Sequence, residues 1–257
     1  MWEPEVAGLR IVLVEPAGPL NVGAIARVMK NFGLQQLVLV NPQCDRLADE
    51  AKLMAVHAWD VLEAASEVAT LPEALQGCMR AIATTARVRA LPGMLEPPRT
   101  ALPWLTATNE SAALIFGPEY RGLSNEELNY AQRFVRIPSS DSYPSLNLAQ
   151  AVAICCYELF MSDREPRQAA DVMTAGSLAS LDVLEGYYQQ LESLLLQIGY
   201  LYPHTAASRM EKFRQLFNRA QLENTEVAML RGILTQMEWA VREEEGGRGQ
   251  GGEGEKE

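Results

Sequence analysis

The stretch LRIVLVEPAGPLNVGAIARVMKNFGLQQLVLV, residues 9–40, decides the fold class. It opens with an apolar run that barely alternates, which is typical of a strand in a parallel sheet covered on both faces. Prolines follow, then an amphipathic helix is predicted from about Val22 to Phe32, and LVLV at 37–40 reads as a second strand. Strand, helix and strand within about thirty residues form a βαβ unit. The sequence therefore predicts an α/β fold, a parallel sheet with helices on both faces.

Length and composition limit the class of protein. The 257 residues are 48% hydrophobic, which is enough for a sizeable core. No apolar run approaches the ~18 residues of a membrane span, and the first five residues lack the features of a signal peptide. We therefore expect a cytoplasmic protein without a membrane segment. The four cysteines form no C-x-x-C pair and there are only two histidines, so we expect reduced structural thiols and no metal site.

The charge is unevenly distributed along the chain. A net charge of −11 argues against a general nucleic-acid binder, which is usually basic. Residues 243–257 hold six acidic and two basic residues among glycines, which predicts a disordered acidic tail. Residues 80–99 hold four arginines and one glutamate. In that window Arg87 and Arg89 are candidate RNA phosphate contacts, and a solvated loop is the alternative.

Polar loops follow three of the predicted strands. Asn21, Gly23 and Arg27 follow the first strand, and Arg27 is predicted to project away from the apolar stripe of its helix. GPEYRGLS at 117–124 follows a second strand, and PSSDSYPSLN at 138–147 follows a third and precedes a strongly apolar helix. Ligands bind outside the carboxyl ends of strands in open α/β sheets, so these loops predict a site. The alternatives are that Arg27 is a solvated charge and that Asn147 only caps its helix.

Together the three loops resemble the motifs of the SpoU/TrmH group of the SPOUT RNA methyltransferases, over roughly residues 9–160. YPSLNLA at 143–149 and RGIL at 231–234 look like the TrmJ branch of that group. That branch methylates the 2′-hydroxyl at position 32 of tRNA with S-adenosylmethionine. The resemblance implies a trefoil knot in the C-terminal part of the α/β domain and a homodimer in which apolar helices pack together.

The resemblance also implies a role for individual residues. Arg27 and Ser145 match catalytic positions, with Asn21 and Asn147 as supporting polar groups. Arg27 is also a candidate RNA contact. The residues that match the cofactor pocket are Thr84, Thr85, Gly117, Glu119, Gly122, Ile137, Pro138, Leu146 and Asn147.

Methyl transfer from a sulfonium is an in-line displacement that needs positioning and no metal. Because a guanidinium stays protonated, our hypothesis is that Arg27 grips the target phosphate and orients the hydroxyl. Ser145 and Asn147 would then complete the hydrogen bonds. Whether Arg27 acts as a base or as a phosphate clamp stays open.

The predicted domains are a SPOUT methyltransferase domain at 1–163, a linker at 164–176, a helical extension at 177–242 and the tail at 243–257. The extension has three predicted helices, and the second is basic, with Arg209, Lys212, Arg214 and Arg219. In the TrmJ branch such an extension is thought to help hold tRNA, whereas a solvated helix face is the alternative.

The prediction is thus S-adenosylmethionine-dependent 2′-O-methylation of tRNA. Two alternatives are kept. One is 2′-O-methylation at another tRNA or rRNA site. The other is a knotted module that binds RNA or S-adenosylmethionine without catalysis.

Overall fold

The computed structural model describes residues 8–86, 95–162 and 178–248. The chain divides into two units, Met1–Ala175 and Gly176–Glu257, each with its own buried hydrophobic cluster. Arg87, Arg89, the predicted linker at 164–176 and the end of the predicted tail lie outside the described residues.

The first unit is built on a seven-stranded sheet in the order β3-β2-β1-β6-β4-β7-β5, and every strand pair is parallel. The predicted α/β class is therefore confirmed. β3 and β5 are too short to leave a sequence pattern, and the strand predicted before the loop at 138–147 ends at Val135. The strands are β1 (Leu9–Val14), β2 (Gln36–Val40), β3 (Ser66–Val68), β4 (Arg80–Thr84), β5 (Leu95–Glu96), β6 (Ala112–Phe116) and β7 (Arg133–Val135).

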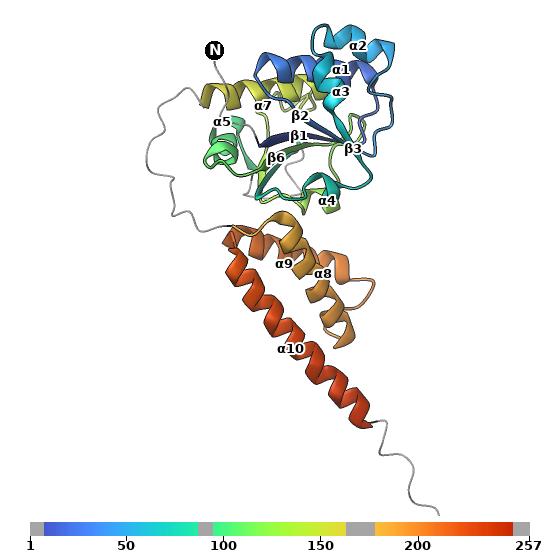
Figure 1. The fold of residues 1–257 in the computed structure, drawn as a ribbon, viewed down its shortest axis with the longest axis vertical. Coiled ribbons are helices and arrows are strands. Elements are labelled where there is room, and N and C mark those ends of the chain that lie inside the picture. Colours follow the sequence, from blue (N-terminus) through green and yellow to red (C-terminus); the bar gives the residue numbers. More distant parts are fainter. Residues whose placement is uncertain (1–7, 87–94, 163–177, 249–257) are drawn as a thin grey trace, which may run out of the picture. The chain divides into compact units, whose positions relative to one another are not determined.

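Helices cover the sheet on two sides. Figure 1 shows α1, α2, α3 and α7 along one face and α4 on the other. Alternation along β1 explains this, because Ile11 and Leu13 join the cluster beneath α1 while Val12 and Val14 are buried on the opposite face. The helices are α1 (Pro19–Asn31), α2 (Asp49–Ala55), α3 (Trp59–Ala64), α4 (Leu71–Ala74), α5 (Pro98–Ala101), the 3-10 helix η2 (Leu102–Thr106), α6 (Asn125–Leu128) and α7 (Leu148–Ser162).

Helix α1 carries the first polar loop of the predicted site. It begins at Pro19, before the predicted start at Val22, because a proline at N1 lacks only an N–H that the first turn does not use. Its stripe of Val22, Ile25 and Met29 is fully buried. Arg27 is exposed, so its predicted direction away from that stripe is confirmed.

Gly23 lets α1 lie against α2 without an intervening side chain. A Cβ at position 23 would stand 2.1 Å from the carbonyl oxygen of Ala51 and 2.8 Å from its Cα, and both are backbone atoms. Gly23→Ala is therefore expected to destabilise the fold by about 3 kcal/mol, because the two helices must separate. Thermal unfolding measures this. The matched control is Gly232→Ala, since nothing lies within 4 Å of that site in α10 and helix propensity predicts a small gain. Equal melting temperatures for the two variants would contradict this account.

The second unit has three helices, α8 (Leu181–Gln197), α9 (Ala206–Ala220) and α10 (Asn224–Arg248). Helix α10 passes the predicted end at Arg242, so the start of the predicted disordered tail is helical. The reason is local, because three glutamates at 243–245 are good helix formers and the chain turns to glycine only after them. Leu184, Leu191, Met210 and Leu234 belong to the core of this unit.

Several chemical features of the described residues bear on the kind of site that they form. In those residues no helix has both the length and the apolar character needed to cross a bilayer. Nor do they contain a group of three or more His, Cys, Asp or Glu side chains able to hold a metal ion. All four cysteines are free. Burial raises the pKa of Cys156 to about 12, so this thiol is a poor nucleophile at neutral pH.

Candidate active site

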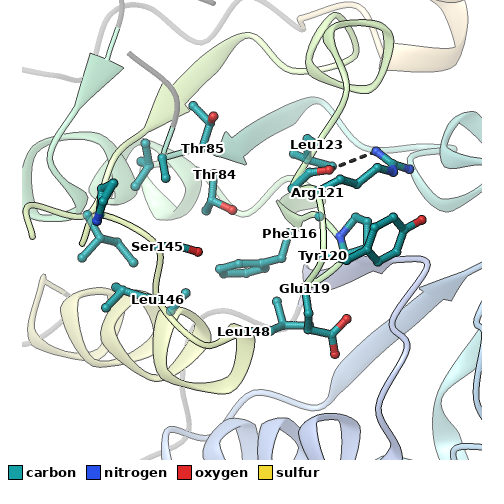
Figure 2. Close-up of a pocket in the computed structure, with 18 residues that line it drawn as sticks. Thr84, Thr85, Phe116, Glu119, Tyr120, Arg121, Leu123, Ser145, Leu146 and Leu148 are labelled. Atoms are coloured by element: carbon teal, nitrogen blue, oxygen red, sulfur yellow. Dashed lines mark hydrogen bonds between the residues drawn. The ribbon is translucent and has the colours of Figure 1, made fainter. Parts of the chain in front are cut away.

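A pocket of about 370 Å³ opens at the carboxyl ends of β4, β6 and β7 (Figure 2). Its volume lies in the range of small-ligand sites, roughly 300–1,000 Å³. It stands where open α/β sheets bind ligands, beyond the strand ends. The residues that line it are Thr84, Thr85, Ala86, Phe116, Gly117, Pro118, Glu119, Tyr120, Arg121, Gly122, Leu123, Val135, Ile137, Pro144, Ser145, Leu146, Leu148 and Ala151.

The pocket wall combines an apolar side with a few polar groups. Phe116, Leu123 and Leu148 are buried and line it, so a flat apolar group of a ligand has a surface to pack against. Ser145 is exposed and its hydroxyl is directed toward the interior (Figure 2). Glu119 provides a carboxylate at the rim.

The loop that follows β6 is folded tightly. A Cβ at Gly117 would lie 2.3 Å from the backbone nitrogen of Leu123 and 2.4 Å from the carbonyl carbon of Gly122, so the loop closes on itself only because position 117 is glycine. Gly122 has a φ of 68°, in the left-handed region that glycine adopts readily. Helix α6 then starts at once, capped by Ser124.

Side chains from the three polar loops form one hydrogen-bonded chain. The Glu119 carboxylate accepts from the backbone nitrogen of Ala17 at 3.1 Å and from Nδ2 of Asn21 at 2.7 Å. Oδ1 of Asn21 accepts from Nδ2 of Asn147 at 3.0 Å. Oδ1 of Asn147 accepts from the backbone nitrogen of Ala149 at 2.9 Å, as an N-cap does. Asn147 is therefore more than a cap, because its amide also joins the third loop to the first.

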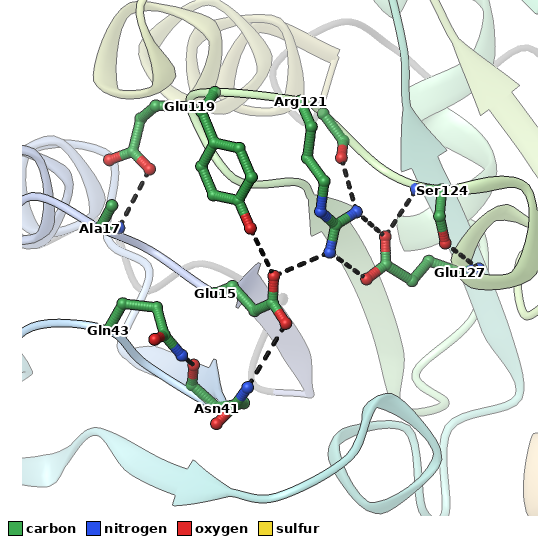
Figure 3. Close-up of polar contacts among 10 residues, drawn as sticks. Glu15, Ala17, Asn41, Gln43, Glu119, Arg121, Ser124 and Glu127 are labelled. Carbon is green, nitrogen blue, oxygen red and sulfur yellow. Dashed lines mark hydrogen bonds and ion pairs between the residues drawn. The ribbon is translucent and has the colours of Figure 1, made fainter.

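A second network holds the loop after β6 to the end of β1 (Figure 3). Arg121 donates to both carboxylate oxygens of Glu127, at 2.7 and 2.8 Å, and to Glu15 at 2.8 Å. The Tyr120 hydroxyl donates to the same Glu15 oxygen at 2.9 Å. Glu15 has a φ of 46°, a conformation that a non-glycine residue keeps only when its surroundings hold it. The hydrogen bonds from Arg121 and Tyr120 keep Glu15 in this conformation.

Arg27 stands apart from both networks. Its side chain is exposed, does not line the pocket, and forms no hydrogen bond or ion pair within the described parts of the chain. The guanidinium is thus available for an anionic partner.

Comparison with known proteins decides the family. Residues 8–157 match the model of the SpoU rRNA Methylase family, and residues 182–246 match the model of the tRNA methyltransferase TrmJ C-terminal domain. The chain is 42% identical over 246 residues to the tRNA (cytidine/uridine/adenosine-2′-O-)-methyltransferase TrmJ of Pseudomonas aeruginosa, covering 91% of this chain and 95% of that one. The chain belongs to the TrmJ branch of the SpoU methylase family.

Two further relatives agree with this assignment. The chain is 41% identical to the tRNA (cytidine/uridine-2′-O-)-methyltransferase TrmJ of Pectobacterium atrosepticum, covering 90% of this chain and 96% of that one. The crystal structure of TrmJ from Z. mobilis ZM4 has a TM-score of 0.80 and 30% identity, and the match covers 90% of this chain and all 100% of that chain. The predicted TrmJ-like identity is confirmed.

The structure brings most of the cofactor residues implied by the TrmJ resemblance to one pocket. Ser145 lines that pocket as well. Pro138 is exposed beside Ile137 and does not line it, and Asn147 lies beside it in the polar chain. The implied residues that do line it are Thr84, Thr85, Gly117, Glu119, Gly122, Ile137 and Leu146.

Other residues of this pocket and of the network beside it were not predicted from the sequence. Phe116 is the last residue of a strand, and Tyr120 and Arg121 stand between the two glycines of the second motif. The available signal was the presence of two large polar residues inside a glycine loop. Glu15 had no signal, because its partner Arg121 lies 106 positions away.

Because of the Arg121 network, the free energy of unfolding should depend on pH in the acid range. Hydrogen bonds from Arg121 and then Tyr120 lower the pKa of Glu15. Burial raises the pKa of Glu127, but hydrogen bonds from Arg121 and Ser124 and the charge of Arg121 together lower it below its usual value. A lowered pKa in the folded state means stability that is present above the ordinary value of 4.5 and is lost as the pH falls through the folded-state pKa. Arg121→Met should therefore flatten the fall in unfolding free energy in this acid range.

Urea unfolding at a series of pH values measures this dependence. The control is Lys212→Met, which also removes one positive charge but from a residue without an ion pair among the described residues. It should keep the wild-type slope. A wild-type slope for Arg121→Met would show that the network adds nothing to stability.

Proposed function

We propose that this protein transfers a methyl group from S-adenosylmethionine to a ribose 2′-hydroxyl of tRNA. The observation that carries the proposal is the hydrogen-bonded chain from Glu119 through Asn21 to Asn147, which joins all three motif loops beside one pocket. Its relatives of about 40% identity over most of the chain are tRNA 2′-O-methyltransferases by name.

The pocket residues fit S-adenosylmethionine. Position 117 has no room for a side chain because the backbone of Gly122 and Leu123 fills that space, so the loop would present backbone groups to the ligand. Leu123, Ile137 and Leu146 offer an apolar surface for an adenine ring, and Glu119 offers a negative charge near a cationic ligand. When bound, the cofactor supplies a methyl group on a sulfonium that a hydroxyl oxygen can attack in line.

The chain's own residues supply positioning. We assign Ser145 and Asn147, which Asn21 orients, to hydrogen bonds at the substrate end of the pocket. Arg27 has no partner among the described residues, and we assign it to the phosphate beside the target ribose. A guanidinium binds phosphate through two parallel hydrogen bonds, which fixes the hydroxyl in direction as well as in distance.

We propose a homodimer in which Arg27 of one chain reaches the pocket of the other. This assignment is supported by the position of Arg27, which does not line the pocket of its own chain. Helices α1 and α7 pack together in the chain and leave Leu20 51% and Tyr157 45% exposed, so apolar surface remains beside the Arg27 helix for a second copy.

Three finer assignments follow from the TrmJ resemblance. We propose a trefoil knot, supported by a path from β6 to β7 on the far side of β4 and then back to the same pocket. We propose position 32 of the anticodon loop as the target. We also propose a cytoplasmic location, where tRNA is modified.

Purified protein incubated with methyl-labelled S-adenosylmethionine and unmodified tRNA tests the function. Mass spectrometry should place the label on the ribose of nucleotide 32, and tRNA from cells without the gene should lack it. Label at another tRNA or rRNA ribose would overturn the target assignment. Cofactor binding without transfer to any cellular RNA would overturn the activity and favour a binding module.

A further inference from the structure

The connection between α8 and α9 exposes three rings. Tyr200 is 53% exposed, Tyr202 is 55% exposed and His204 is also exposed, whereas Leu201 between the tyrosines is 1% exposed. The rings of Tyr202 and His204 stack at 6.0 Å with an angle of 26°. The Arg209 guanidinium lies 5.7 Å from the centroid of the Tyr200 ring. We call Tyr200, Tyr202 and His204 the aromatic platform.

The backbone fixes the platform in place. Gly199 ends α8 with a φ of 75°, and the nitrogen of Leu201 donates to the carbonyl of Leu195 at 2.9 Å. The carbonyl of Tyr202 accepts from the nitrogen of Ala206 at 2.9 Å in the first turn of α9. Rings held outward in this way do not serve the core of the unit, and little conformational entropy is lost when something stacks on them.

A cationic face continues from the platform along α9. Arg209, Lys212 and Arg219 are exposed and lie on one side of the helix by their spacing, over a length of ~15 Å. Lys212 and Arg219 form no ion pair or hydrogen bond within the described residues. Arg214 is excluded from this face, because it is paired with Glu185 at 2.6 and 2.8 Å. The acidic chain thus concentrates positive charge beside exposed rings.

We propose that the aromatic platform stacks an unpaired base of the RNA substrate, while Arg209, Lys212 and Arg219 bind the adjoining phosphates. This rests on the proposed function and adds the part of the RNA that is recognised. Flat π faces beside cations match bases and phosphates together. An acidic protein partner would pair with the cations, but it would offer no flat surface to stack on the exposed rings. A duplex hides its base faces, so the ligand class is a loop, bulge or single-stranded end.

Fluorescence anisotropy with the full chain and labelled tRNA tests the stacking. The double variant Tyr200→Ala/Tyr202→Ala is expected to raise Kd about tenfold, the usual cost of losing one stacked base. Tyr200→Phe/Tyr202→Phe should bind like the wild type, because stacking does not need the hydroxyls. Trp239→Ala is the control, since it removes an exposed ring of the same unit that lies outside the platform and is 55% exposed.

The dependence of tRNA affinity on salt concentration distinguishes the contribution of the rings from that of the cations. Lys212→Ala/Arg219→Ala should reduce the slope of log K against log salt by about 1.4, the value for two phosphate contacts on a single strand. The tyrosine variant should shift affinity at every salt concentration and keep the wild-type slope, because stacking releases no counterions.

The outcomes distinguish the platform from the enzyme activity. If tRNA binds the alanine double variant as tightly as the wild type, the stacking proposal is refuted, even when methyl transfer occurs as proposed. If wild-type protein transfers no methyl group but the Kd changes appear, the activity is wrong and the platform stands. Competition by RNA oligonucleotides gives the last check. A single strand should compete better than a duplex of equal length, and equal competition overturns the proposal.

Discussion

Arg27→Ala is expected to lower the rate of methyl transfer about 10³-fold while S-adenosylmethionine binds as in the wild type. The guanidinium is exposed, has no partner among the described residues and does not line the pocket of its own chain. Its loss should therefore leave the cofactor contacts intact and remove the group that orients the target nucleotide. Single-turnover rates at saturating tRNA measure the first effect, and calorimetric titration with the cofactor measures the second.

Arg27→Lys distinguishes a fork of two hydrogen bonds from a simple positive charge. An ammonium keeps the charge but cannot bind a phosphate through two parallel bonds, so we expect a loss of about 10²-fold. Lys30→Met is the control on the same helix, because Lys30 is bonded to Asp60 and to the carbonyl of His57, away from the motif loops. Near-normal turnover by the lysine variant would contradict the role assigned to Arg27.

The fold could be predicted from the sequence where the pattern of apolar residues lies within one short segment. The unbroken apolar run of β1, the stripe of α1 and the second apolar run of β2 each lie within one short window, and together they predict a parallel pair. The strands β3 and β5 were not predicted, because three and two residues carry no period. Their place is set by pairing with neighbours that are already in the sheet.

The candidate site was predictable where a polar loop follows a strand, and less so where the hydrogen-bond partners lie far apart in the sequence. Asn21, Glu119 and Asn147 were found in this way, although their mutual hydrogen bonds follow from the sheet order and could not be predicted. The Glu15 to Arg121 pair also depends on the neighbouring positions of β1 and β6. The ring exposure of Tyr200 and Tyr202 was missed for a similar reason, since tyrosine occurs equally in cores and at surfaces.

Gly117→Ala is expected to weaken S-adenosylmethionine binding at least about 100-fold, because the added Cβ meets backbone on two sides. The contacts would be 2.3 Å to the nitrogen of Leu123 and 2.4 Å to the carbonyl carbon of Gly122, neither of which can rotate away. The loop must open and carry Glu119 away from Asn21. Calorimetry gives the affinity. Gly186→Ala is the control, since its nearest neighbour is the mobile end of Arg231 at 3.6 Å, and it should bind normally.

Mixing the Arg27→Ala and Gly117→Ala proteins tests where the arginine acts. If Arg27 crosses to the other subunit, each mixed dimer has one complete site, formed by the intact pocket of the first variant and the intact arginine of the second. Random exchange should then restore activity to about a quarter of the wild-type value, because half of the dimers are mixed and each has one working site of two. If Arg27 serves the pocket of its own chain, no mixed dimer has a complete site and the mixture stays as inactive as its parts. That result would refute the proposed geometry even if both single variants behave as expected.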